Sequence, residues 1–210
     1  MTLKKIHKSK SKELREQFNI TGLFYKNGGF SFRKYLNIKL KTSSKTIPDL
    51  MLVMMNPGSS KPLNEKDNFN KETPTIPDNT QDQIMQVMLQ CGFEYARILN
   101  LSDKRESKSG EFYKNIDTLD KKGIAHSIFD DRRIDDFEDL FVKDIPVIFA
   151  WGVSSKLRGL ARQAVERIGN ENIFGIKKVD YDWAYYHPLP RIYKDRIKWV
   201  DDIVEMINKK

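Results

Sequence analysis

Three short segments carry residue types that could bind a ligand and act on it. They are Asn56-Pro57-Gly58, Trp151-Gly152 and His187-Pro188. In each, proline or glycine holds the backbone in a fixed turn, which lets a main-chain N–H approach a ligand while one polar side chain projects beside it. The competing interpretation is that all three are only tight turns. Because each segment follows a predicted strand, we also consider the hypothesis that the three segments line one shared cleft.

The elements that would position these segments alternate between strand and helix after Pro48. We expect buried strands over 50–55, 94–101, 146–151 and 173–179, and helices over 80–91, 134–141, 154–168 and 192–208. Residues 20–41 indicate a β-hairpin around the turn Asn27-Gly28-Gly29. A charged loop is expected after residue 101. Ligands of open α/β sheets bind beyond the carboxyl ends of the strands, where all three segments would lie.

The order of these motifs resembles an uncharacterised bacterial and phage domain family. That family's signature is Asn-Pro-Ser, Asp-Pro-Thr, Asn-Leu, Ala-Trp-Gly and His-Pro-Leu, and this chain has MMNPGSS, ETPTI, ILNL, FAWG and YYHPLPR between Pro48 and Arg191. The first two motifs depart from the signature, since Asn-Pro-Gly-Ser replaces Asn-Pro-Ser and a glutamate begins the second. Membership of this family would imply no activity.

More remotely, the same order is similar to the uracil-DNA glycosylase superfamily. The resemblance implies a three-layer α/β/α fold with a central, mainly parallel four-stranded sheet, to which this chain would add its N-terminal β-hairpin. It also implies catalytic roles for Asn56, which would orient the attacking water, and for His187, which would donate a hydrogen bond to the departing base. Asn100 would read the base edge or cap its own loop. The substrate-binding residues would be Pro57, Gly58, Ser59, Asn100, Trp151, Gly152, Ser154 and Arg191.

At several positions this chain differs from particular branches of the superfamily. Cys91 is the single cysteine, which excludes the branch with an iron–sulfur cluster. Asn56 stands where another branch has its catalytic aspartate. Leu189-Pro190 replaces the serine-rich wedge after the His-Pro motif, so the chain lacks the wedge residues that penetrate a duplex.

The length, composition and charge of the chain limit which other classes of protein it can belong to. The 210 residues suit one domain, taken as 20–210 behind a basic tail at 1–19, and the longest apolar run is too short to cross a membrane. Of the net charge of +8, the first 41 residues supply +9, so the remainder is close to neutral. Without an apolar segment typical of a secretion signal, the chain is expected to be cytoplasmic. No cofactor or metal is expected, and His126 is expected to be solvated.

These observations support three hypotheses about the function of the protein. The first is hydrolysis of an N-glycosidic bond in nucleic acid or a nucleotide. The alternative is a non-catalytic module that binds a nucleotide or nucleic acid in the same cleft. The third is an interaction domain whose acidic segment 130–144 meets a basic partner, although its acids are more simply a solvated helix face.

Overall fold

The β-strands form one mixed sheet. The computed structural model describes residues 11–64 and 71–209. Seven strands lie in the order β4-β1-β2-β5-β3-β6-β7. Neighbours from β4 to β5 are antiparallel, and those from β5 to β7 are parallel. The strand bounds are β1 Phe18–Asn27, β2 Phe30–Leu40, β3 Leu50–Met54, β4 Thr73–Pro74, β5 Tyr95–Asn100, β6 Val147–Phe149 and β7 Ile173–Phe174.

The predicted α/β class is therefore correct, but the sheet is larger than the four strands predicted and is not mainly parallel, because half of its neighbouring pairs are antiparallel. The hairpin β1–β2 is continuous with the sheet, because β2 pairs antiparallel with β5 from Leu36↔Ile98 to Lys39↔Tyr95. The strand expected over 173–179 is also too long. It ends at Phe174, and Gly175 follows with φ 149.

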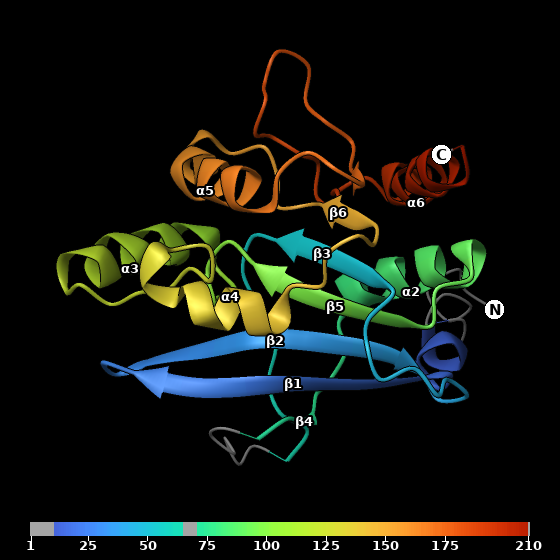
Figure 1. Cartoon of the computed structure of the whole chain (residues 1–210), viewed down its shortest axis with the longest axis horizontal. Helices are drawn as coiled ribbons and strands as arrows, with labels where there is room; N and C mark the ends of the chain where they lie inside the picture. The colour runs from blue at the N-terminus through green and yellow to red at the C-terminus, as the bar shows by residue number, and fades with distance from the viewer. Residues whose placement is uncertain (1–10, 65–70, 210) are drawn as a thin grey trace.

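Helices cover both faces of the sheet (Figure 1). Alternate residues of β3 point to opposite faces, so Leu50 and Leu52 join one apolar cluster while Met51 and Val53 join the other. Helices α2 and α6 pack on the first face, and α3, α4 and α5 pack on the second. The helices are α2 Asn79–Cys91, α3 Ser109–Lys121, α4 Ile134–Leu140, α5 Arg158–Ile168 and α6 Tyr193–Asn208, with short 3₁₀ turns η1 Asp131–Arg133 and η2 Ser155–Leu157.

Helix α3 occupies the region expected to be a charged loop. Its buried residues are Phe112 and Leu119, seven positions apart, so both lie on one helical face. Tyr113 and Ile116 are partly buried beside them, so the apolar residues repeat at helical spacing, a pattern that the loop prediction overlooked. The loop prediction was wrong for this segment.

The described part of the predicted tail is attached to the domain. The Arg15 guanidinium donates to both carboxylate oxygens of Asp82 in α2, at 2.6 and 2.8 Å. Phe18 then begins β1 with its side chain in the core. Residues 1–10 of the tail lie outside the described residues. Within the described ranges, no helix combines the length and the apolar character required to span a bilayer.

Candidate functional site

The carboxyl edge of the parallel strands brings the predicted segments together. Strands β3, β5 and β6 are parallel neighbours, so Asn56, Asn100 and Gly152 all follow or end strands at the same edge. The segment before His187 joins them, because the Gly152 N–H donates to the Tyr185 carbonyl at 2.8 Å. Four sites far apart in sequence therefore meet at one edge.

Asn56 is held by its amide nitrogen. Nδ2 donates to the carbonyls of Lys104, at 3.2 Å, and Glu106, at 2.7 Å. Because only the nitrogen of this amide can donate, these bonds fix its orientation and direct Oδ1 away from the two carbonyls. The turn that follows has a buried Pro57, Gly58 with φ 59 and an exposed Ser59.

His187 is a neutral imidazole of defined tautomer. The Leu189 N–H donates to its Nδ1 at 3.1 Å, so that nitrogen carries no proton and the neutral ring has its proton on Nε2. Burial lowers the pKa of His187 to about 4, although the Asp78 carboxylate opposes this shift. At neutral pH the ring can donate a hydrogen bond without carrying a charge.

Asn100 is bound to a residue that the sequence analysis missed. Both Asn100 and Arg33 are buried, and the Arg33 Nη2 donates to the Asn100 Oδ1 at 2.9 Å. Among the described residues, Arg33 Nε, Arg33 Nη1 and Asn100 Nδ2 are buried without a hydrogen-bond partner. Burial lowers the pKa of Arg33 to about 10, so the guanidinium stays charged at neutral pH.

A β-bulge turns Arg33 toward this position. Gly22 pairs with Leu36 and Phe24 pairs with Arg33, so Lys34 is an extra residue in β2. Paired residues share a face, so Arg33 lies on the same face as Leu36, beneath α2. In an unbroken strand, residues three positions apart point to opposite faces. The sequence carries no turn or glycine at Lys34 that would reveal the bulge.

Other predicted residues take different positions. Trp151 is only 1% exposed, its ring contacts Phe149 and Tyr185, and its Nε1–H donates to the Trp183 carbonyl at 2.8 Å. This side chain is a core residue. Ser154 stands at the N-cap position of η2 without a side-chain cap bond, and Arg191 is exposed before α6. The structure does not bring either side chain into contact with Asn56.

His126 is not the solvated residue that the sequence predicted. It is 3% exposed, with Nδ1 3.0 Å from the Ser102 hydroxyl and Nε2 3.1 Å from the Asp120 carboxylate. These are the residue types of a nucleophilic triad, but Ser102 is fully buried and its oxygen accepts the Lys104 N–H at 3.2 Å. A nucleophile must reach substrate. The chain Ser102–His126–Asp120 instead anchors the loop that holds Asn56.

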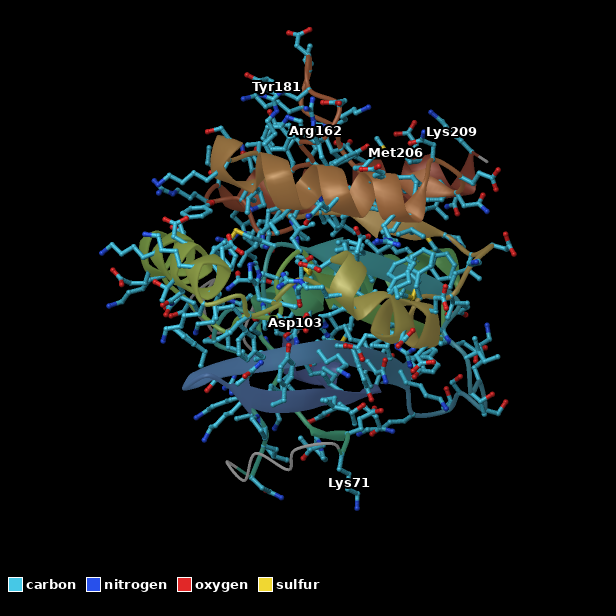
Figure 2. All side chains as sticks on the ribbon, turned by 60° about the vertical axis from the view of Figure 1, so that its left-hand side comes forward. Lys71, Asp103, Arg162, Tyr181, Met206 and Lys209 are labelled. Carbon is cyan, nitrogen blue, oxygen red and sulfur yellow. The ribbon has the colours of Figure 1, made fainter. Side chains whose placement is uncertain are left out.

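The buried ion pair of Asp103 and Arg133 supports this loop from the opposite side. Asp103 lies between the hairpin and the helices above it (Figure 2). Its Oδ2 accepts from Arg133 at 2.6 Å and from the Tyr25 hydroxyl at 2.9 Å, and its carbonyl accepts the Arg33 N–H at 2.9 Å. The acidic segment 130–144 is partly neutralised, because Asp136 in this segment pairs with Arg133 and Lys34.

A shallow cavity of about 380 Å³ adjoins the Asn56 loop. It is bounded by the hairpin turn, by the turn after Asn56 and by the segment after Ser102; its lining residues are Gly29, Phe30, Ser31, Gly58, Ser59, Lys104, Arg105, Glu106 and Ser107. Across the described residues, no group of three or more His, Cys, Asp and Glu side chains is arranged to hold a metal ion. The polar side chains that line the cavity supply hydroxyl, ammonium, guanidinium and carboxylate groups.

The profile of the family described as "Protein of unknown function (DUF1643)" matches residues 35–189. The chain belongs to this family. The matched region includes Asn56, Asn100 and His187, begins two residues after Arg33 and ends two residues before Arg191. The family's description names no activity. No curated protein and no solved structure matches the chain.

Proposed function

We propose that the chain hydrolyses the N-glycosidic bond of a base in nucleic acid or a nucleotide. The observation that carries this proposal is the state of His187, whose Nδ1 accepts the Leu189 N–H and whose pKa is lowered to about 4. A neutral imidazole with a proton on Nε2 is suited to stabilise negative charge on a departing base, because it donates without needing a counter-charge.

The reaction requires little base catalysis. The bond between C1′ and the base nitrogen breaks with its electron pair passing to the base, the oxygen of a water bonds to C1′, and the water's proton is released to solvent. Bond breaking leads in an oxocarbenium-like transition state, so the water needs positioning more than deprotonation. Asn56 Oδ1 would supply that positioning, because its nitrogen is already held by Lys104 and Glu106.

The arrangement of strands and helices supports a likeness to the uracil-DNA glycosylase superfamily. Strands β5, β3, β6 and β7 lie side by side and are parallel, and helices cover both faces. The backbone of Pro57–Ser59, the start of η2 at Ser154 and the exposed Arg191 are the proposed contacts for a phosphate or a base oxygen.

The test is release of base from defined oligonucleotides. Purified full-length chain is incubated with single- and double-stranded DNA that carries uracil, hypoxanthine or mismatched thymine, and abasic product is measured. We expect His187→Gln to lower the rate by about 10²-fold, since it removes the imidazole donor. Asn56→Ala should lower it further, while the exposed Asn170→Ala serves as the matched amide control.

Two results would contradict the hydrolase. One is the absence of abasic product from every substrate. The other is unchanged activity in both site variants, provided that their urea unfolding midpoints show that they are folded. The alternative function is a non-catalytic binding module that uses the same site. The unpartnered donors of Arg33 and Asn100 favour it, because they indicate a bound ligand but not a reaction. Binding without turnover would establish that alternative.

A further inference from the structure

Arg33 is a buried charge with most of its hydrogen-bonding capacity unused. Its side chain is 2% exposed, and only Nη2 has a partner, the Asn100 Oδ1. Nε and Nη1 have none among the described residues. A buried donor that lacks a partner is destabilising, and buried polar groups in folded proteins are normally bonded. The unused donors therefore indicate a ligand.

The unpartnered atoms of the Arg33–Asn100 pair are all donors. A guanidinium cannot accept a hydrogen bond, so the Asn100 oxygen must face it and the Asn100 amide nitrogen must face elsewhere. That nitrogen is also buried without a partner in the described part of the chain. The complementary ligand edge carries adjacent acceptors and no donor.

The charges around Arg33 favour an acceptor edge over a full anion. The Asp78 and Asp103 carboxylates act on Arg33 and raise its pKa, in opposition to burial and to Arg105, which lower it. With Arg105 the two carboxylates and two guanidinium groups cancel in formal charge, so no net positive charge is left here to favour a phosphate or carboxylate. A neutral base that gains negative charge only as it departs needs no such net positive charge when it binds.

We propose that Arg33 and Asn100 form the base-recognition part of this site and select a 6-oxopurine, such as hypoxanthine, through its O6 and N7 acceptors. Arginine donates to this pair of acceptors in the recognition of guanine. This inference rests on the proposed function, because it names the base that the proposed hydrolase would bind at the carboxyl edge of the parallel strands. The unpartnered nitrogens of Arg33 and Asn100 are buried from solvent. A base therefore reaches them only when the protein groups that cover them move aside.

The donor-only edge discriminates between bases that differ by one group. Adenine keeps N7 but replaces O6 with an amino group, which would oppose the donors of Arg33. Uracil places an N–H between its two carbonyl oxygens, and this donor would oppose the unpartnered donors of Arg33 and Asn100. Hypoxanthine and adenine are therefore a matched pair of probes.

The experiment is isothermal titration of the full chain with hypoxanthine, adenine, uracil and inorganic phosphate. We expect hypoxanthine to bind at least about tenfold more tightly than adenine or uracil, and phosphate not to displace it. Arg33→Met should reduce hypoxanthine affinity to the level of adenine, and Arg33→Lys, which keeps the charge but loses the planar donors, should restore only part of it. Arg162→Met, at an exposed arginine of α5, is the control and should change nothing.

The inference is overturned if adenine or uracil binds as tightly as hypoxanthine, if no base binds, or if phosphate displaces hypoxanthine. It is also overturned if folded Arg33→Met and Arg33→Lys bind hypoxanthine as the parent chain does. Failure of the hydrolase is a separate result, because tight hypoxanthine binding without base release contradicts the catalysis and leaves the recognition intact. Release of uracil that does not depend on Arg33 contradicts the recognition alone.

Discussion

At the scale of single residues, the site is defined by amide and imidazole groups whose orientations are fixed by backbone contacts. Asn56 is bound to two carbonyls, and His187 accepts a backbone N–H. Neither orientation requires another side chain. Arg33 differs from both, because it is charged and buried and its Nε and Nη1 have no hydrogen-bond partner among the described residues.

The pKa of His187 predicts a dependence of stability on pH. The unfolded residue has a pKa of 6.5 and the folded residue one of about 4, so between these values the unfolded state binds the proton more readily. Protonation therefore favours unfolding, and this stability is lost as the pH falls from 6.5 toward 4, by up to about 3 kcal/mol. Urea unfolding at pH 7 and pH 4.5 measures the change.

The variant His187→Gln isolates this contribution from that of the acidic groups. It cannot be protonated in this range, so its loss of stability between the two pH values should be smaller than that of the parent chain. An equal loss in both proteins would show that His187 does not titrate with a lowered pKa.

At the scale of elements, the start of α2 links the helix to the site. The Asp78 side chain accepts from the backbone N–H groups of Thr80, at 2.7 Å, and Gln81, at 3.3 Å, and the Asp78 N–H donates to the Gln81 side-chain Oε1. This capping box fixes the beginning of the helix that packs over Arg33. The same carboxylate acts electrostatically on both Arg33 and His187.

Two substitutions at Asp78 separate its cap from its charge. Asp78→Ala removes both and should lower the free energy of unfolding by about 1 kcal/mol, whereas Asp78→Asn keeps a side-chain oxygen for the cap and should lower it much less. Guanidinium unfolding curves of the two variants give the difference. Equal destabilisation would mean that the charge of Asp78, and not its cap, stabilises the fold.

At the scale of the whole molecule, the positive charge is unevenly distributed along the chain. The net charge of +8 arises in the first 41 residues, and residues 1–10 alone contain four lysines. Arg15 is paired with Asp82, so its charge is already partnered within the domain. Residues 1–10 supply +4 of the +9 in the first 41 residues, so part of any sequence-independent attraction to nucleic acid should depend on them.

Removal of residues 1–10 tests this prediction without disturbing the Arg15–Asp82 pair. The truncated chain should keep its unfolding midpoint but lose part of its salt-sensitive affinity for nonspecific DNA, with the slope of log K against log salt reduced in magnitude by up to about 3 to 4. Fluorescence anisotropy across a salt series measures that slope. An unchanged slope would assign the contacts to the folded domain.

The sequence by itself determined the features that depend on local pattern. Apolar runs placed β3, β5 and β6, and the polar residues that follow them reached one edge because parallel neighbouring strands must end together. Only the tertiary structure decided features that depend on pairing between distant segments. The union of the hairpin with β5, the burial of His126 and the bulge that turns Arg33 toward Asn100 have no local signal, because register and partner choice are set when distant strands pair.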